Sequence, residues 1–232
     1  MSRKTIYFHH SLLFFAILLV LTFAVVALVF VGAVSIAFEN VGFTPVTILL
    51  ILVGTLIGSF INIPLLELKT TVPVIREEYV SWFGITYRIP QVEYGQTATV
   101  VAVNVGGALI PTAVSIYLLC KSTPSTIILS LVGLAAVALV THAVARPVKG
   151  VGIVTPVFIP PIAAAVVAII LSPAQPRTIA YVAGVLGTLI GADLLNLHAV
   201  PKLGAPVASI GGAGSFDGVF LTGIIAVLLA GL

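Results

Sequence analysis

Seven long runs of apolar residues, separated by short polar segments, make up most of this chain. The runs cover residues 11–34, 44–66, 97–119, 125–143, 151–172, 177–199 and 205–231. A helix needs roughly 20 such residues to cross the hydrocarbon core of a bilayer. Lipid offers backbone groups no hydrogen-bond partner, so we expect every run to be helical. The pattern predicts an all-α fold: a polytopic membrane helix bundle with seven transmembrane helices, forming a single domain over residues 1–232.

The first run follows a short basic segment that contains Arg3 and Lys4. Its length exceeds the roughly 7–15 apolar residues of a signal peptide. We therefore expect an uncleaved first span.

The basic residues predict the orientation of these spans. If the N-terminus is cytoplasmic, eight of the ten Lys and Arg residues fall on the cytoplasmic side: Arg3, Lys4, Lys69, Arg76, Arg88, Arg146, Lys149 and Lys202. Only Lys121 and Arg177 fall outside. An excess of Lys and Arg in cytoplasmic loops is the usual rule, so we predict an N-in, C-out topology.

The longest connection, residues 68–95, lies on the cytoplasmic side between the second and third spans. Its segment 79–89 is rich in β-branched and aromatic residues around Gly84. This pattern predicts a short cytoplasmic β-hairpin between helices two and three. Aromatic side chains such as Trp82 and Tyr87 are expected at the level of the lipid headgroups.

Composition narrows the class of protein further. Of 232 residues, ten are Lys or Arg and seven are Asp or Glu, 60% are hydrophobic, and the mean hydropathy is +1.28. So few charges cannot cover a water-soluble surface, which excludes a soluble enzyme, a disordered tail and a nucleic-acid binder. We expect a multi-pass protein of the cell membrane whose main partner is the lipid bilayer. With Cys120 as the sole cysteine and no Cys/His ligand spacing, the sequence predicts no metal site and no cofactor.

A short internal repeat links two of the runs. The pentapeptide Gly-Thr-Leu-Ile-Gly occurs at 54–58 and again at 187–191, followed by Asn62 and Asn196 respectively. Glycines four residues apart also serve close helix packing, which is the alternative explanation. If the repeat is real, segments 44–119 and 177–231 form a parallel internal repeat, a pattern that points to a transporter binding site.

The two aspartates carry the candidate chemistry. All five glutamates lie in or beside predicted loops, whereas Asp193 and Asp217 fall inside the sixth and seventh runs. A charged side chain within a span is costly and is a candidate functional residue by default. Counting residues along each helix places both aspartates in the cytoplasmic half of the bundle, near several amides and a glycine-rich break in the seventh run. The predicted site residues are Asp193, Asp217, Asn62, Asn104, Asn196, Gly212 and Gly214.

Three functions fit a buried aspartate pair. Two carboxylates that share a proton can exchange H⁺ for Na⁺ or another cation, with Asn62 and Asn104 as neutral ligands, so a cation- or proton-coupled carrier of a small ion or solute is the leading hypothesis. The same pair can activate water, as in an intramembrane aspartyl protease that cleaves a membrane peptide substrate with Asp193 and Asp217 as catalytic residues. In a non-catalytic scaffold, the pair would only join helices six and seven by hydrogen bonds.

The protease hypothesis draws on a resemblance to presenilin-type intramembrane aspartyl proteases, which place one Asp on helix six and one on helix seven. The Gly-x-Gly-Asp signature of that family is replaced here by Gly-Ala-Gly-Ser-Phe-Asp at 212–217, and its Tyr-Asp by Ala-Asp at 192–193.

A second resemblance covers most of the chain. It rests on Ile-Gly-Gly-Ala-Gly-Ser-Phe-Asp-Gly-Val-Phe-Leu-Thr-Gly at 210–223, supported by Gly-Ala-Asp-Leu-Leu at 191–195 and Phe-Gly-Ile-Thr-Tyr at 83–87. These segments resemble an uncharacterised prokaryotic multi-spanning membrane family, domain of unknown function 1614. The resemblance implies a membrane protein and assigns no activity.

Overall fold

The larger part of the chain is helical. The computed structural model describes residues 10–82, 85–149, 152–212 and 218–232. Within these ranges the α-helices are α1 (His10–Asn40), α2 (Pro45–Gly58), α3 (Ile110–Lys121), α4 (Pro124–Val144), α5 (Ile159–Leu171), α6 (Pro176–Thr188) and α7 (Gly218–Ala230). Three helical stretches are long and apolar enough to cross a membrane: Leu13–Asn40, Pro124–Val144 and Pro176–Pro201. These stretches indicate a membrane protein.

Local sequence explains where two of the helices begin. Thr44 precedes α2 and Thr123 precedes α4, and each hydroxyl accepts a hydrogen bond from the backbone N–H three residues later, at 3.4 Å. A proline follows each threonine at the first helical position, where its missing N–H costs nothing. Both helices therefore start from the same threonine–proline signal.

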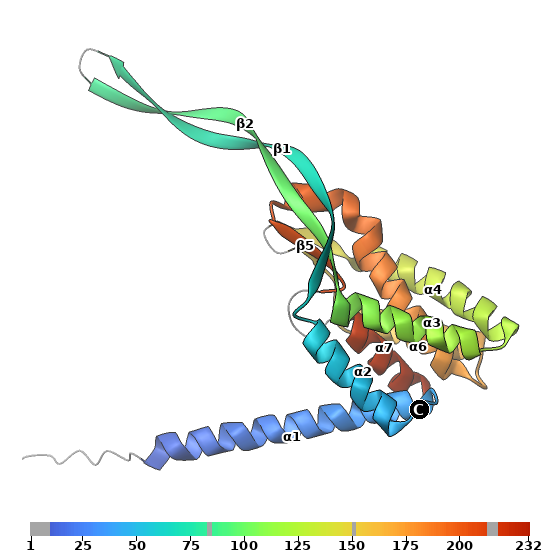
Figure 1. Ribbon diagram of the computed structural model, residues 1–232. Coiled ribbons are helices and arrows are strands. Elements are labelled where there is room, and N and C mark those ends of the chain that lie inside the picture. The colour runs from blue at the N-terminus through green and yellow to red at the C-terminus, as the bar shows by residue number, and fades with distance from the viewer. Residues whose placement is uncertain (1–9, 83–84, 150–151, 213–217) are drawn as a thin grey trace, which may run out of the picture.

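The helical winding changes at two places. A π-helix, η1 (Val105–Leu109), leads into α3, and a second, η2 (Leu189–Asp193), follows α6 and passes into the 3₁₀-helix η3 (Leu194–Leu203). Departures from α-helical winding are frequent at functional sites. Both changes lie at the end of the bundle from which the long hairpin leaves (Figure 1).

That hairpin consists of β1 (Asn62–Trp82) and β2 (Ile85–Asn104), which pair antiparallel from Asn62↔Asn104 to Trp82↔Ile85. At about 3.3 Å per residue, strands of this length extend roughly 65 Å. Figure 1 shows them as a twisted ribbon that projects away from the helices. We call β1 and β2 together the arm.

Two further pairings lie at the base of the arm. Strand β5 (Val207–Ile210) runs parallel to β2, from Val100↔Val207 to Val103↔Ile210. Strands β3 (Arg146–Val148) and β4 (Gly152–Val154) form a separate antiparallel pair. The segments between α4 and α5 and between η3 and α7 are therefore partly extended.

The prediction of an all-α fold is confirmed in part. The described chain is mostly helical, but it also contains two sheets, one of which includes the predicted hairpin. Residues 62–66 and 97–104 were expected inside the second and third spans but belong to the arm. The hairpin was expected to be short, but its two strands pair at twenty positions. A continuous apolar run does not by itself separate strand from helix. The run 97–104 (Thr-Ala-Thr-Val-Val-Ala-Val-Asn) is rich in β-branched residues, which favour the extended conformation.

The core lies around α6 and α7. Tyr181 and Phe220 are fully buried, and both rings contact Phe38 of α1, with ring centroids 5.7 Å and 6.2 Å apart. Small residues bring the backbones close. A Cβ at Gly184, for example, would lie 3.4 Å from Ala164 of α5 and from Thr222 of α7. Most of α6 is thus enclosed by its neighbours.

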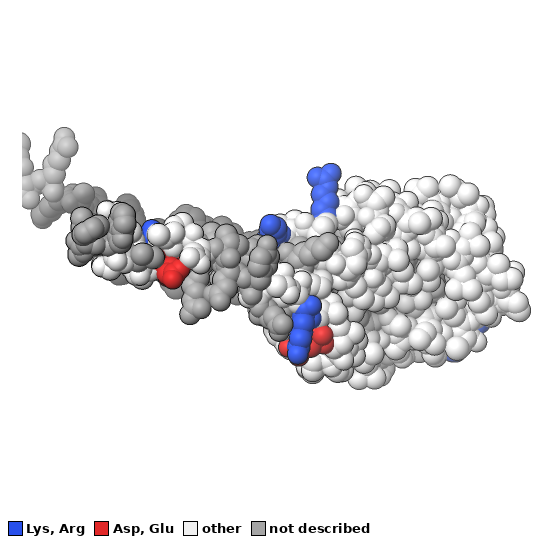
Figure 2. Space-filling model, turned by 90° about the horizontal axis from the view of Figure 1, so that it is seen from above, with Lys and Arg blue, Asp and Glu red and all other residues white. Residues whose placement is uncertain are grey.

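The outside of the bundle is apolar. Large hydrophobic side chains along α1 are open to the surroundings, with Leu19 and Phe23 72% and 74% exposed. Figure 2 shows the helical body as an almost continuous white surface, with charged residues gathered on the arm and near its base. An apolar surface of this extent is expected for helices that lie in lipid.

Candidate functional site

A cavity of about 620 Å³ lies at the base of the arm. It is bordered by the end of α6, η2, η3, β4, β5 and the start of α7. The described residues that line it are Asn62, Gly152, Ile153, Val154, Thr155, Thr188, Ala192, Asp193, Leu197, Val200, Ala205, Val207, Ala208, Ser209, Ile210, Gly212, Gly218 and Val219. We call it the arm-side cavity. Its volume falls within the range of small-molecule sites.

Asp193 is the charged group of this cavity. It is the last residue of η2, and among the described lining residues it is the one ionisable side chain. Its Oδ2 accepts a hydrogen bond of 2.7 Å from the backbone N–H of Gly211. This bond fixes the carboxylate beside the loop that follows β5 and leaves Oδ1 without a described partner.

Gly211 and Gly212 allow that loop to lie against η1 and β2. Gly211 has φ +67°, and a Cβ there would come within 2.6 Å of Ala108 Cβ and 2.8 Å of Ala108 N. A Cβ at Gly212 would lie 2.6 Å from Asn104 Cβ. Side chains at these two positions would therefore push the loop, and the donor to Asp193, out of place.

Two amides and a hydroxyl tie β1, β2 and β5 together. Ser209 Oγ donates to Asn62 Oδ1 at 2.6 Å, and Asn104 Nδ2 donates to the same oxygen at 3.1 Å and to Ser59 O at 2.7 Å. Asn104 Oδ1 accepts from the N–H of Gly107 at 2.8 Å, which caps η1. The cluster holds the strand ends in place and presents Asn62 and Ser209 to the cavity.

Two threonine hydroxyls at the cavity lack partners. Thr188, 5% exposed, and Thr155 both line the cavity, and the Oγ1 atom of each is buried without a hydrogen bond in the described structure. Leaving a buried polar group unsatisfied costs about 1–3 kcal/mol. Both oxygen atoms are themselves buried, so they lie behind the surface of the cavity and are not open to it.

The predicted site residues fall into three groups. Asp193, Asn62 and Gly212 line the cavity, and Asn104 lies directly behind Asn62. Asn196 is buried elsewhere, where its Nδ2 donates to the carbonyls of Gly191 and Ala192 and so closes the turn of η2.

The remaining two predicted residues, Asp217 and Gly214, lie outside the described residues. The pairing of Asp193 with Asp217, on which the protease hypothesis depends, therefore stays a prediction. Among the described residues, no group of three His, Cys, Asp or Glu side chains that could hold a metal ion is found.

Sequence reasoning missed Ser209, Thr188 and Thr155. Serine and threonine are common in membrane helices, where they bond to their own backbone, so residue type alone gave no signal for them. Thr188 lies in the repeated pentapeptide and Ser209 lies at the start of the glycine-rich segment. These two positions are the sequence features that could have marked the residues as part of the site.

The second glycine of each pentapeptide lies at a close backbone contact. A Cβ at Gly58 would lie 2.9 Å from Gly106 N, and a Cβ at Gly191 would collide with Ala138 O. These contacts fit the packing explanation of the repeat. Descent of segments 44–119 and 177–231 from one parallel repeat remains a hypothesis.

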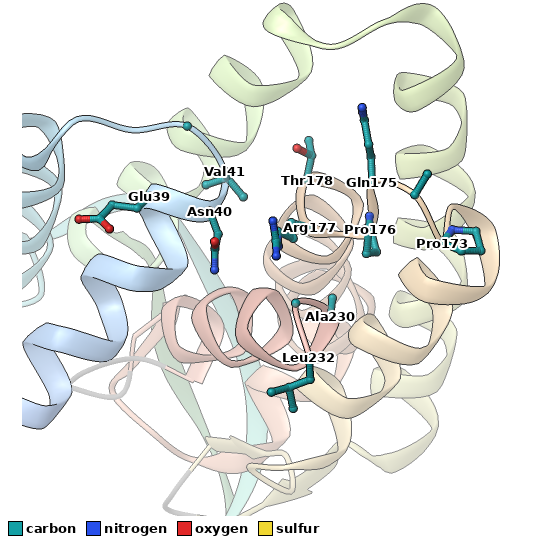
Figure 3. A pocket seen from close by; sticks show the side chains of 13 residues that line it. Glu39, Asn40, Val41, Pro173, Gln175, Pro176, Arg177, Thr178, Ala230 and Leu232 are labelled. Atoms are coloured by element: carbon teal, nitrogen blue, oxygen red, sulfur yellow. The ribbon is translucent and has the colours of Figure 1, made fainter.

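A second hollow, of about 590 Å³, lies at the other end of α6 and α7, where α1 ends and the chain terminates. Figure 3 shows Arg177 on the side of α6 that faces Asn40, while Glu39 points away from it. A Cβ at Gly231 would lie 3.1 Å from Arg177 Nε, so this guanidinium lies against the C-terminal end of α7, where a cation is favourable. The two cavities have no lining residue in common.

Comparison with known proteins gives one match. No curated protein and no solved structure matches the chain. Nothing found supports the similarity to presenilin-type proteases. The model of a family described as "Protein of unknown function (DUF1614)" matches residues 56–229, a range that includes every described residue of the arm-side cavity. The chain therefore belongs to the DUF1614 family of proteins of unknown function.

Proposed function

We propose that this chain is a multi-pass carrier of the cell membrane, cation- or proton-coupled, which binds a small ion or solute in the arm-side cavity with Asp193 as the charged contact. The observation that supports it most strongly is the carboxylate of Asp193 in a solute-sized cavity, at the point where the winding of the α6 helix changes. Transporters commonly place their sites where interrupted helices meet.

The lengths of the other helices also favour a carrier. Helices α2, α5 and α7 have 14, 13 and 13 residues, which span about 20 Å. The hydrocarbon core is about 30 Å thick, so strands and loops would have to complete these three crossings. Extended backbone at membrane depth is tolerated where it is buried in protein or lines a water-filled cavity. Strands β4 and β5 line the arm-side cavity in this way.

We further propose seven spans with an N-in, C-out topology, which places the arm in the cytoplasm. Lys69 lies on the arm and Arg146 and Lys149 lie at or beside β3, all at the base of the bundle from which the arm leaves. Lys121 ends α3 and Arg177 begins α6, at the opposite end. This distribution of basic residues agrees with the positive-inside rule.

Reconstitution into liposomes tests the carrier. Proton movement, followed by an entrapped pH dye, is measured against empty liposomes under gradients of Na⁺, K⁺ or ethanolammonium. We expect at least one of these cations to drive proton movement through the wild-type chain, and Asp193→Asn to abolish it. The asparagine oxygen can still accept the hydrogen bond of Gly211, so the fold is expected to survive.

Glu39→Gln is the matched control, because it makes the same change of carboxylate to amide on an exposed residue at the other end of the bundle. It is expected to keep wild-type proton movement. Proton movement that Asp193→Asn leaves unchanged, or none above empty liposomes with all three cations, would contradict the proposal. A folded Asp193→Asn protein whose only change is lower thermal stability would favour a scaffold.

A further inference from the structure

We infer that the segment between α4 and α5 binds the headgroups of anionic phospholipids at the surface of the membrane. Two cations and three exposed apolar side chains carry this inference: Arg146, Val148, Lys149, Val157 and Phe158. We call these five residues the interfacial patch. The inference names a partner of the chain and does not depend on transport through the arm-side cavity.

The patch lies where two apolar helices end. Helix α4 is long and apolar enough to cross a membrane, and Arg146 follows its last residue by two positions. Phe158 immediately precedes α5, which is itself apolar. Residues at the ends of apolar helices of this kind lie close to the level of the lipid headgroups. The whole segment is therefore expected at the surface of the bilayer.

The charge of the segment is positive. Arg146 and Lys149 are exposed, and neither has a hydrogen bond or an ion pair in the described structure. The sequence between α4 and α5 contains no Asp or Glu. On the neighbouring η2, which β4 contacts, the carboxylate of Asp193 lies at the arm-side cavity and is bonded to the N–H of Gly211. Guanidinium and ammonium groups that are free in this way suit the phosphate of a lipid headgroup.

The pairing of β3 with β4 shows which way the first cation faces. Arg146 pairs with Val154, and Pro147 pairs with Ile153, which packs against the hydrophobic core. Successive residues of a strand point to opposite faces. Arg146 and Val148 therefore lie on the face opposite to that core contact, and Val148 is exposed.

The apolar members of the patch favour a membrane over a soluble anion. Val157 and Phe158 are 63% and 68% exposed, directly beside the positively charged segment. Apolar side chains next to cations are the pattern of a surface that rests in the boundary between headgroups and acyl chains. A phospholipid offers both the phosphate and the acyl chains, whereas a free phosphate ion would leave the valine and the phenyl ring in water.

Native mass spectrometry of the detergent-purified full chain tests the inference. The chain is incubated with equal amounts of phosphatidylglycerol and phosphatidylcholine that have the same acyl chains. We expect at least about fivefold preference for phosphatidylglycerol, and a smaller preference when the salt is raised from about 0.1 M to about 0.5 M, because salt screens exposed charges. Equal retention of the two lipids, or a preference that salt leaves unchanged, would overturn the inference.

Variants locate the site. Arg146→Gln/Lys149→Gln should lower the preference at least about fivefold, since each Lys or Arg at an anionic membrane surface changes binding by about that factor. Lys121→Gln/Arg177→Gln is the matched control, because it removes the same charge at the opposite end of the bundle, and it should keep the wild-type preference. The charge-conserving Arg146→Lys/Lys149→Arg should keep it too. An unchanged preference in the first variant, confirmed as folded by circular dichroism, or an equal loss in the control would overturn the assignment to this patch.

A soluble competitor distinguishes the membrane from a free anion. Glycerol 3-phosphate has a phosphate headgroup without acyl chains, and an excess of it should leave the bound phosphatidylglycerol in place. Displacement by this compound would indicate a site for soluble anions and overturn the inference. Lipid retention is measured without any gradient, so its failure would leave the carrier untouched, and failure of proton movement in liposomes would leave the lipid site untouched.

Discussion

Replacing Gly211 by alanine should reveal how tightly the loop beside Asp193 is held. The backbone at Gly211 has φ +67°, a conformation that costs an L-residue about 1–2 kcal/mol. The new Cβ would also meet Ala108 Cβ at 2.6 Å and Ala108 N at 2.8 Å, and such overpacking typically costs about 1–3 kcal/mol. We expect Gly211→Ala to lower the free energy of unfolding by about 2–5 kcal/mol in all.

Gly204 provides the matched control. Its φ is +70°, but nothing lies within 4 Å of a Cβ built there, so Gly204→Ala should lose only the conformational part, about 1–2 kcal/mol. Unfolding by SDS in mixed micelles, followed by circular dichroism, compares the two variants. The double variant Gly211→Ala/Ala108→Gly should recover part of the difference, because it removes the contact with Ala108 Cβ and leaves the one with Ala108 N. Equal losses for Gly204→Ala and Gly211→Ala would refute the packing of this loop against η1.

Three further predictions concern the rest of the structure. Gly106→Ala should lower the free energy of unfolding by roughly 3 kcal/mol, because its Cβ would collide with the backbone of α2. Gly54→Ala is the control: its Cβ meets only Ile110 Cδ1, at 3.5 Å, so this change should be neutral or slightly stabilising. Both variants are compared by SDS unfolding, and equal effects would argue against the close approach of α2 and η1. Asn104→Ala should cost about 2–4 kcal/mol in the same assay, because Ser59 O and Gly107 N lose their partner, and a loss below 1 kcal/mol would contradict this. A membrane-impermeant maleimide should label Cys120 from outside intact cells. In the double variant Cys120→Ser/Tyr79→Cys, the cysteine at position 79 should be labelled only from the cytoplasmic side. Labelling of both positions from the same side would contradict the proposed topology.

The apolar pattern predicted helices well where a span is one continuous helix. The run 125–143 corresponds to α4 (Pro124–Val144), whose start is set by Thr123 and Pro124. It failed where one apolar run contains two kinds of structure, as in 97–119, which begins as strand β2 and ends as α3. Hydrophobicity reports burial or contact with lipid, and both are compatible with either conformation.

The candidate site was predicted only in part, for a related reason. Asp193 and Asn62 stood out because charged and amide side chains are rare in apolar runs. Thr188 and Thr155 did not, because a threonine hydroxyl in a helix commonly bonds to its own backbone, and only the structure shows that these two do not. The contact of Gly211 with Asp193 joins residues 18 positions apart, which helical spacing cannot predict.

The most direct test of the carrier is the accessibility of the cavity from the two sides of the membrane. In a Cys120→Ser background, Ala205→Cys places one thiol at the wall of the arm-side cavity, and an impermeant maleimide is applied to right-side-out and to inside-out vesicles. A carrier must open its site to each side in turn, so we predict labelling of this thiol in both preparations. Labelling from the cytoplasmic side alone, or from neither side, would contradict a carrier and leave a membrane protein with a fixed cavity.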